Sequence, residues 1–232
     1  MPAPSTTWFE SLPKARLLAE FSMWSADLAR LADDLARIAP HADMLHIDVA
    51  DGHFAPALLF FPDLLAAMRK HSSIPVHVHL MVADHVLISQ ADQFAEAGAD
   101  LISIHAENAN AAAALAHIKA KGLKAGVVLK VETPVSAAAP LMAQTDILTL
   151  LGTAIGVKGQ GLNDKATARL GEAKALIARH MNGSRIILAA DGGIREHTVP
   201  ELRMAGAETV VLGSLAFGAP DLAQRMAWLK SL

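Results

Sequence analysis

Short apolar segments alternate with segments rich in Ala, Leu, Lys and Glu eight times along the 232 residues of this chain. Alternation of this kind is typical of parallel strands joined by helices, and eight strands in a chain of this length predict a single (β/α)8 TIM barrel of the α/β class. A doubly wound open sheet is the competing architecture. We expect the barrel to span residues 17–232, after a short N-terminal extension, residues 1–16, that contains three prolines.

The eight predicted strands are short runs in which β-branched and other apolar residues dominate. They cover Leu17–Ser22, Met44–Val49, Pro75–Leu80, Leu101–His105, Lys124–Leu129, Asp146–Leu151, Arg185–Ala190 and Thr209–Leu212. Amphipathic segments between them predict helices over Ser25–Ile38, Val86–Ala97, Ala111–Lys121, Lys165–His180 and Thr198–Ala205. Gly98, Gly122 and Gly206 follow three of these helices, where a left-handed C-terminal cap favours glycine.

Composition places the chain among globular proteins and narrows its partners. Hydrophobic residues make up 53% and charged residues 19% of the sequence, which excludes an intrinsically disordered chain. A formal net charge of −3 offers no global basic surface for nucleic acid or anionic membranes. The lack of cysteine excludes disulfides, thiol catalysis and thiolate metal ligands. Because there is neither a signal-peptide pattern nor an apolar stretch of membrane-spanning length, we expect a cytoplasmic enzyme without nucleic acid or membrane partners.

Histidine and aspartate side chains gather at the carboxyl ends of three predicted strands, where the active sites of (β/α)8 barrels lie. His46 and Asp48 are two residues apart and therefore share one face of the second strand, as His77 and His79 share one face of the third. Asp191 ends the seventh strand. A site made of two of these histidines and the two aspartates suits Zn²⁺, Fe²⁺, Mn²⁺ or Co²⁺ better than Mg²⁺ or Ca²⁺. We expect one divalent metal ion at this end of the barrel.

Three glycine clusters follow the last three predicted strands and are candidate phosphate-binding turns. The run Gly156–Gly161 lies in the long connection after strand six, Gly192-Gly193 follows strand seven, and Gly213-Ser214 follows strand eight. Glycine lets backbone N–H groups approach an anion closely, and the loops after strands seven and eight are the usual phosphate site of such barrels. The connection after strand six is a candidate lid or phosphate cradle over the same face.

Seven segments, in order along nearly the whole chain from about residue 17, form a wider pattern. They are Ser22-Met23-Trp24-Ser25-Ala26-Asp27-Leu28, His46-Ile47-Asp48-Val49-Ala50-Asp51-Gly52-His53-Phe54, His79-Leu80-Met81, Ala97-Gly98-Ala99-Asp100, Ala125-Gly126-Val127-Val128-Leu129, Asp191-Gly192-Gly193 and Gly213-Ser214. Together they resemble the signatures of the ribulose-phosphate 3-epimerase family. The segment from His46 to Phe54 is the most specific of them.

This resemblance implies a metal-dependent isomerase that inverts the carbon next to the carbonyl of a phosphorylated ketose, with ribulose 5-phosphate and xylulose 5-phosphate as the reference pair. It implies a metal site formed by His46, Asp48, His79 and Asp191. Asp48 and Asp191 match the acid–base pair, which exchanges protons on opposite faces of an enediolate. We expect the substrate to contact Ser22, His79, Gly156, Lys158, Gly159, Gln160, Gly192, Gly193, Gly213 and Ser214. The family also implies a homo-oligomer.

The sequence departs from the family at residues that we expect to surround the substrate. Ala50 stands where a methionine is usual, Lys130 lies where L-N-P is usual, and His77 replaces the aspartate of a D-x-H-L segment. The metal and acid–base residues are retained, so the pattern favours the same chemistry on a different keto-sugar phosphate. We take Ala50 and Lys130 as specificity candidates and expect activity on ribulose 5-phosphate to be weak or secondary.

Two other functions remain open at this point. Lys130, at the end of strand five, could form a Schiff base with a ketone, as in a sugar-phosphate lyase. Trapping with borohydride would reveal such an imine, which an epimerase does not form. The other alternative is a non-catalytic sugar-phosphate-binding barrel, which would bind its ligand without exchanging substrate protons with solvent. It leaves the retention of both aspartates unexplained.

Overall fold

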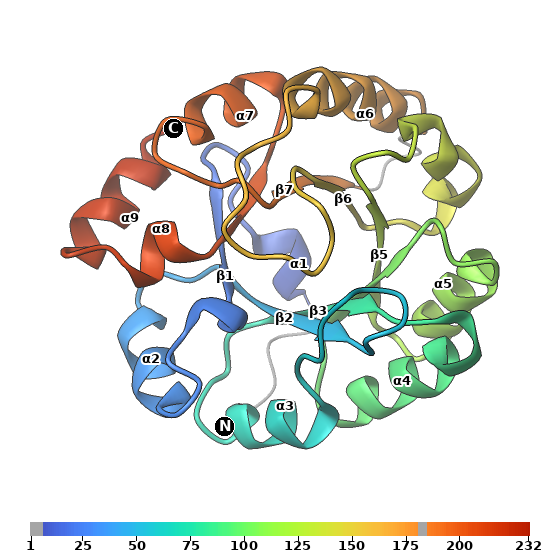
Figure 1. Ribbon diagram of the computed structural model, residues 1–232, viewed down its shortest axis with the longest axis horizontal. Helices are drawn as coiled ribbons and strands as arrows, with labels where there is room; N and C mark the ends of the chain where they lie inside the picture. Colours follow the sequence, from blue (N-terminus) through green and yellow to red (C-terminus); the bar gives the residue numbers. More distant parts are fainter. Residues whose placement is uncertain (1–6, 181–184) are drawn as a thin grey trace.

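The computed structural model describes residues 7–180 and 185–232, in which eight parallel strands form a closed barrel (Figure 1). Each strand pairs with the next along the chain, and the eighth pairs with the first. The strands are β1 (Leu18–Ser22), β2 (Met44–Ala50), β3 (Val76–Met81), β4 (Leu101–His105), β5 (Lys124–Leu129), β6 (Ile147–Leu151), β7 (Ile187–Asp191) and β8 (Thr209–Leu212). The predicted (β/α)8 barrel is therefore confirmed, and the predicted strands agree with the observed ones to within two residues at either end.

Helices surround the barrel as an outer ring (Figure 1). They are α2 (Leu31–Ile38), α3 (Pro62–Arg69), α4 (Asp84–Glu96), α5 (Ala111–Ala120), the 3₁₀ helix η2 (Val135–Gln144), α6 (Ala166–His180), α7 (Val199–Ala205), α8 (Ser214–Phe217) and α9 (Leu222–Lys230). A second 3₁₀ helix, η1 (Met23–Ser25), follows β1 directly. The glycines predicted to cap helices, Gly98, Gly122 and Gly206, all have the positive φ angles that such caps require.

The helix predicted over Ser25–Ile38 is wrong in its first half. The chain makes a turn there instead, and α2 begins only at Leu31. The Asp27 carboxylate accepts a hydrogen bond from the backbone N–H of Ala29 at 3.0 Å, and the Asp27 carbonyl accepts one from Arg30. An aspartate side chain that accepts a hydrogen bond from the backbone N–H two residues later favours a turn over a helix, which explains why α2 begins later than predicted.

Alternate residues of every strand point into the barrel, where they form layers along its axis. The layer at the amino ends of the strands is apolar and includes Leu18, Met44, Leu101, Ile147 and Ile187. The layers above it, toward the carboxyl ends, carry the polar side chains described below.

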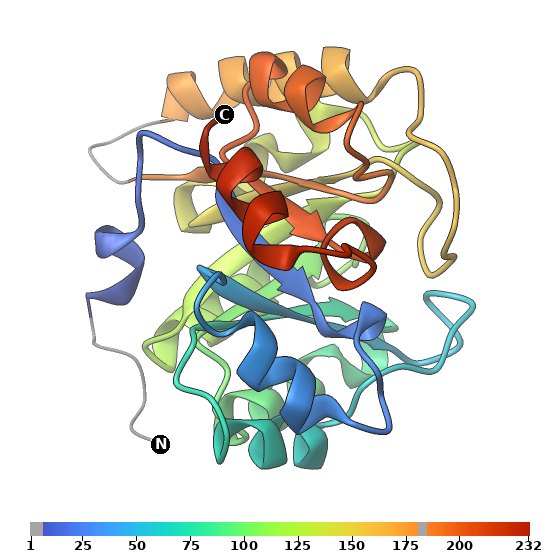
Figure 2. The ribbon, with the colours of Figure 1, turned by 90° about the vertical axis from the view of Figure 1, so that its left-hand side faces the viewer.

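A short helix in the predicted N-terminal extension, α1 (Trp8–Ser11), covers the apolar layer. Figure 2 shows α1 at the end of the barrel opposite the long connections that follow β2 and β6. Phe9 and Leu12 are 2% and 7% exposed and pack in one cluster with the first inward residues of the strands. The amino end of the barrel is thus closed by side chains, which leaves the carboxyl end as the place for a site.

No helix in residues 7–180 and 185–232 combines the length and the apolar character that a membrane crossing requires.

Candidate metal centre and active site

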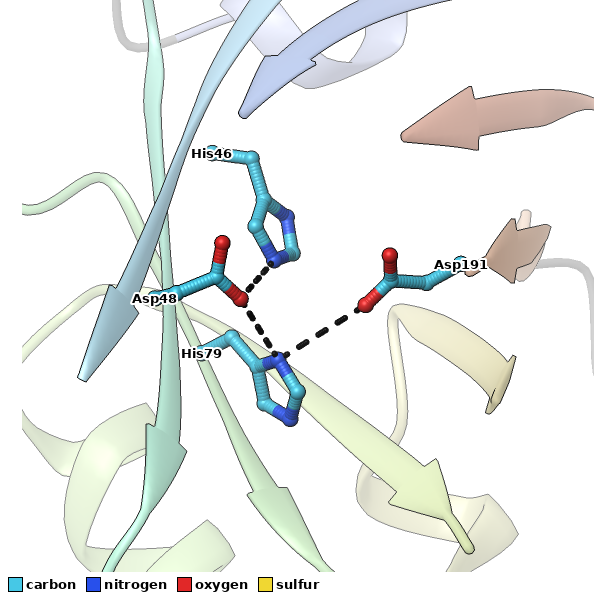
Figure 3. A group of neighbouring side chains, drawn as sticks. All are labelled: His46, Asp48, His79 and Asp191. Carbon is cyan, nitrogen blue, oxygen red and sulfur yellow. Dashed lines mark hydrogen bonds and ion pairs between the residues drawn. The ribbon is translucent and has the colours of Figure 1, made fainter. Parts of the chain in front are cut away.

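Four side chains from three strands meet at the carboxyl end of the barrel (Figure 3). His46 and Asp48 come from β2, His79 from β3 and Asp191 from the end of β7. One ligand atom from each of the four lies within 4.8 Å of the corresponding atoms of the others. The register of the sheet explains the meeting, because Asp48 pairs directly with His79 across β2 and β3. The structure therefore brings together the four residues that the sequence predicted as a metal site.

Close contacts within this group centre on the Asp48 carboxylate and on Nδ1 of His79. Asp48 Oδ1 lies 3.2 Å from Nε2 of His46 and 3.4 Å from Nδ1 of His79. Asp191 Oδ2 approaches the same His79 nitrogen at 3.9 Å from the opposite side (Figure 3). The second oxygen of Asp48 accepts a hydrogen bond from the Ser22 hydroxyl at 2.9 Å.

The tautomer of a neutral His79 ring follows from its contact with His105. Burial lowers the pKa of His105 to about 4, so this imidazole is neutral at pH 7. Nδ1 of His105 donates to Glu107 Oε2 at 2.9 Å, which leaves Nε2 of His105 as an acceptor. The 2.9 Å contact between the two Nε2 atoms therefore requires His79 to donate, so that Nδ1 carries the lone pair when the ring is neutral.

The Nδ1 atom of His79 indicates whether the four residues fit a metal ion. Nδ1 of His79 is buried and has no hydrogen-bond partner in the described part of the chain. Buried polar atoms without partners are rare in folded proteins and require an explanation. Two imidazole nitrogens and two carboxylates around one point suit a divalent ion such as Zn²⁺, Fe²⁺, Mn²⁺ or Co²⁺. The residues present therefore fit a metal centre.

The two carboxylates of this group have pKa values shifted in opposite directions. Burial raises the pKa of Asp191 to about 6, and the neighbouring charge of Asp48 acts in the same direction. Burial acts the same way on Asp48, but the charge and hydrogen bond of His46 outweigh it and hold the pKa of Asp48 well below its usual range. Carboxyl groups whose pKa values are pushed apart are typical of acid–base pairs.

A cavity of about 350 Å³ opens above the four residues. Of the predicted site residues, twelve border it: Ser22, Asp48, His79, Gly156, Lys158, Gly159, Gln160, Asp191, Gly192, Gly193, Gly213 and Ser214. His46 lies beneath the cavity and is completely buried. Trp24, Met81, Thr153, Ile155 and Arg195 also border the cavity, although the sequence did not single them out as site residues.

The specificity candidates Ala50 and Lys130 do not belong to the residues that border this cavity. Ala50 packs in a small apolar cluster with Ala55 and Met81, and only Met81 of these reaches the cavity. The Lys130 ammonium lies 3.7 Å above the centre of the Phe54 ring. A cation–π contact of this kind accounts for the lysine without a Schiff base, so the geometry does not favour the lyase alternative.

Lys158, in the connection after β6, crosses to the segment that follows β1. Its ammonium donates to the carbonyl oxygen of Trp24 at 2.5 Å and lies 4.5 Å from the centre of the Trp24 ring. Burial lowers the pKa of Lys158. This contact places one positive charge at the rim of the cavity, close to the turns after β7 and β8.

A closed barrel that carries a candidate metal centre, a carboxylate pair and a cavity at its carboxyl end defines a TIM-barrel enzyme. The ribulose-phosphate 3 epimerase family model matches residues 18–217. Curated ribulose-phosphate 3-epimerases from Aquifex aeolicus and Cupriavidus necator are 38% and 37% identical to the chain, over 85% and 86% of it and 87% and 84% of their own lengths. The chain belongs to the ribulose-phosphate 3-epimerase family, and is a homologue of these carbohydrate isomerases.

Solved structures of other enzymes share the fold. A 3-hexulose-6-phosphate synthase from Salmonella typhimurium superposes with a TM-score of 0.65 at 15% identity, covering 93% of this chain and 97% of that one. An orotidine 5'-phosphate decarboxylase from Pyrococcus horikoshii superposes with a TM-score of 0.63 at 11% identity, over 92% and 98% of the two chains. Identities this low establish the architecture and nothing about the reaction.

Proposed function

We propose that the protein is a metal-dependent epimerase that inverts the carbon next to the carbonyl of a phosphorylated ketose. The substrate is ribulose 5-phosphate, with xylulose 5-phosphate as product, or a related keto-sugar phosphate. The observation that carries this proposal is the position of Asp48 and Asp191, which reach the cavity from opposite sides of the barrel mouth (Figure 3). Inversion requires such an arrangement, since a proton leaves one face of the carbon and another arrives on the opposite face.

The two aspartates exchange roles during one turnover. An ionised carboxylate on one side removes the proton, and the electron pair of the broken C–H bond moves toward the carbonyl oxygen to give an enediolate. The protonated carboxyl on the other side then donates its proton to the opposite face of the same carbon. At the end one aspartate holds the proton taken from the substrate, and the other has lost its own proton to the product, so the reverse reaction starts from the exchanged state.

His46, Asp48, His79 and Asp191 would hold the metal ion. When bound, a divalent cation supplies Lewis-acid stabilisation for the negative charge that develops on the substrate oxygens. His79 presents the lone pair of Nδ1 toward both aspartates because its Nε2 proton is held by His105. Ser22 orients the Asp48 carboxylate through its 2.9 Å hydrogen bond.

The turns after β7 and β8 would bind the phosphate group. Gly192 and Gly193 have φ angles of 88° and 70°, which side chains rarely adopt. A Cβ atom at Gly193 would lie 2.7 Å from the backbone of Leu162, so the turn has room for glycine alone. Together with Gly213 and Ser214, these residues border the cavity and offer backbone N–H groups to an anion. Lys158 adds a positive charge from the connection after β6.

This proposal has finer aspects with different grounds. A cytoplasmic location and assembly as a homo-oligomer are what family membership implies. A keto-sugar phosphate other than ribulose 5-phosphate as the best substrate is instead what the departures from the family at Ala50, Lys130 and His77 favour. The cavity supports the last of these only in part, because Lys158 borders it whereas Ala50 and Lys130 do not.

Uptake of deuterium from solvent into ketose phosphates of four to six carbons tests the proposal. Asp48→Asn and Asp191→Asn should each reduce the rate of uptake about 10²–10⁴-fold, the usual contribution of a general acid or base. Asp63→Asn, at an exposed aspartate of α3, is the matched control and should exchange at the wild-type rate. Full exchange in both active-site variants would exclude these aspartates as the acid–base pair. Binding of all the phosphates without exchange in the wild-type protein would instead indicate a non-catalytic barrel.

A further inference from the structure

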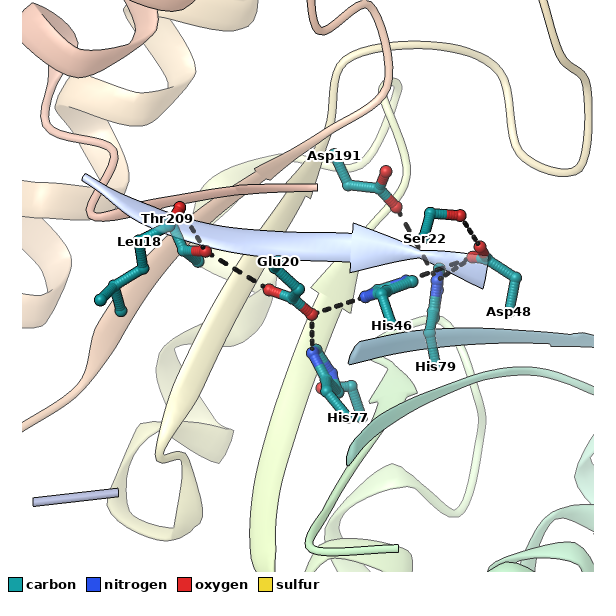
Figure 4. Close-up of polar contacts among 10 residues, drawn as sticks. Leu18, Glu20, Ser22, His46, Asp48, His77, His79, Asp191 and Thr209 are labelled. Carbon is teal, nitrogen blue, oxygen red and sulfur yellow. Dashed lines mark hydrogen bonds and ion pairs between the residues drawn. The ribbon is translucent and has the colours of Figure 1, made fainter. Parts of the chain in front are cut away.

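The barrel interior directly beneath the candidate metal centre is polar, and a carboxylate lies at its centre. Glu20 on β1, His46 on β2 and His77 on β3 are each at most 1% exposed (Figure 4). The apolar layer closed by α1 lies on one side of them, and the cavity lies on the other. Burying a carboxylate is costly unless hydrogen bonds and charge compensate for it, so the contacts of Glu20 indicate its role.

Glu20 is bound by two imidazoles through the same oxygen. Oε1 accepts from Nδ1 of His46 at 2.6 Å and from Nδ1 of His77 at 2.5 Å. The other oxygen, Oε2, lies 3.5 Å from the Thr209 hydroxyl (Figure 4). Burial acts to raise the pKa of Glu20, but the charges and hydrogen bonds of the two histidines outweigh it and lower the pKa. Two imidazole N–H groups that converge on one carboxylate oxygen also favour the ionised form by geometry, and this carboxylate lies below the metal ligands.

His77 extends the same chain of hydrogen bonds across the barrel. With its Nδ1 proton donated to Glu20, Nε2 of His77 accepts from the Ser103 hydroxyl at 2.6 Å. Gly126 on β5 leaves space for that hydroxyl, since a Cβ atom at this position would lie 1.8 Å from Ser103 Oγ. The ring of His77 thus has a partner at each nitrogen and no freedom to turn away from Glu20.

These contacts fix the orientation of His46, whose ring contacts Glu20 through one nitrogen and Asp48 of the candidate metal centre through the other. Because Nδ1 of His46 is committed to Glu20, only Nε2 faces Asp48, at 3.2 Å. We propose that Glu20 is a positioning residue of the metal centre, whose buried carboxylate fixes the His46 ring with Nε2 toward the metal and adds a negative charge beneath it. This inference rests on the proposed metal-dependent function.

His77 is one of the positions at which the chain departs from the family pattern. In this chain Glu20 on β1 accepts the hydrogen bond from His46, and His77 is the second donor to the same carboxylate oxygen. Glu20 touches neither the cavity nor a substrate, so it acts only through His46. Removing it should change how the metal binds without changing which residues border the substrate.

Two substitutions separate the charge of Glu20 from its hydrogen bonds. Glu20→Gln keeps an oxygen for both imidazoles, turns its amide toward Thr209 and removes the charge. Glu20→Ala removes the charge and both hydrogen bonds. Partners that orient metal-binding histidines typically contribute 10- to 100-fold to affinity. We expect Zn²⁺ affinity, measured by calorimetry on metal-free protein, to fall about tenfold in Glu20→Gln and about 100-fold in Glu20→Ala.

Thr149→Val is the matched control, because Thr149 is equally buried inside the barrel and its hydroxyl has no hydrogen-bond partner in the described residues. This variant should bind Zn²⁺ as the wild type does. The visible absorption bands of the Co²⁺-loaded protein give a second readout, since they depend on the ligand geometry. They should change in Glu20→Ala and stay the same in Thr149→Val, which a general loss of stability would not produce.

Each outcome decides a different question. Unchanged Zn²⁺ affinity and unchanged Co²⁺ bands in both Glu20 variants would overturn the role of Glu20 and leave the proposed function intact. A wild-type protein that binds no divalent ion would overturn the proposed metal-dependent function, and the inference with it. If Glu20→Ala does not fold, Glu20→Gln still decides the question, because it keeps the shape and the hydrogen-bond acceptor.

Discussion

Glu107 controls which nitrogen of His79 carries the proton, and replacing it with glutamine should reverse that choice. One oxygen of Glu107 accepts from the Lys130 backbone N–H at 2.9 Å and from the Thr133 hydroxyl, and the other accepts from Nδ1 of His105. Burial acts to raise the pKa of Glu107, but these hydrogen bonds lower it to about 2. Glu107 is therefore an acceptor at both oxygens throughout the neutral pH range.

Glutamine offers one acceptor and one donor, so it cannot reproduce this pattern. The oxygen should stay with Lys130 and Thr133, where two donors meet, and the amide should turn toward His105. Nδ1 of His105 must then accept, its Nε2 must donate to His79, and the proton of His79 moves to Nδ1. Nδ1 of His79, which faces Asp48 and Asp191, then carries the proton and has no free lone pair for a metal ion.

The expected loss of Zn²⁺ affinity follows from the tautomer of His79, because Nδ1 can bind a metal ion only when it carries no proton. Restoring the lone pair costs roughly one unsatisfied buried hydrogen bond, about 1–3 kcal/mol. Since about 1.4 kcal/mol is a factor of ten, we expect Zn²⁺ affinity to fall about 10- to 100-fold in Glu107→Gln. Glu201→Gln, at an exposed glutamate of α7, is the control.

Calorimetry with Zn²⁺ measures the affinity, and ¹⁵N NMR of the imidazoles in metal-free protein reports the tautomer. We expect Nε2–H for His79 in the wild type and Nδ1–H in Glu107→Gln. Wild-type affinity together with an unchanged His79 tautomer would refute the reasoning, because the hydrogen-bond chain would then not control the proton.

Three further predictions concern stability, pH and substrate binding. Phe9→Ala should lower the free energy of unfolding by about 3 kcal/mol, seen as a melting temperature lower by roughly 6–12 °C, while kcat/KM is kept; a loss of activity at unchanged stability would contradict this. Burial raises the pKa of Asp191 to about 6, so below that pH a proton competes with the metal for this carboxylate. In the metal-free protein the protonated carboxyl contributes to folding stability at low pH, and this contribution is lost as the pH rises through 6. Zn²⁺ affinity measured between about pH 5 and 8 should therefore fall on the acid side, and a flat profile would exclude this competition. Lys158→Met should raise KM for the phosphorylated substrate about tenfold with a smaller change in kcat, and equal KM values in both proteins would remove Lys158 from phosphate binding.

The barrel and its metal centre were predictable because their signals are local. His46 and Asp48 are two residues apart on one strand, so their common face follows from strand geometry alone. Strands that close in order place β2 beside β3, and the observed register then sets Asp48 beside His79. Residues of these types at strand ends therefore predicted a metal site at this end of the barrel, and the resemblance to the family selected His79 rather than His77 as the ligand from the third strand.

Other features depend on contacts that the sequence pattern does not reveal. Glu20 lies two residues before Ser22 and shares its inward face, a spacing that could have marked it, but a single glutamate in an apolar run does not identify the two histidines that bind it. Lys130 was predicted to reach the substrate. Its ammonium instead lies over Phe54, which is far away in the sequence and is brought near only by the folded loop after β2.

The cap formed by α1 over the amino end of the barrel has a practical consequence for protein engineering. Phe9 and Leu12 support the fold from the side opposite the cavity, and neither is among the residues that border it. Substitutions beneath the cap can therefore be selected for heat resistance, while the turns after β6, β7 and β8 are randomised separately for new substrates. Because the two regions lie at opposite ends of the barrel (Figure 2), improvements found in one should add to those found in the other.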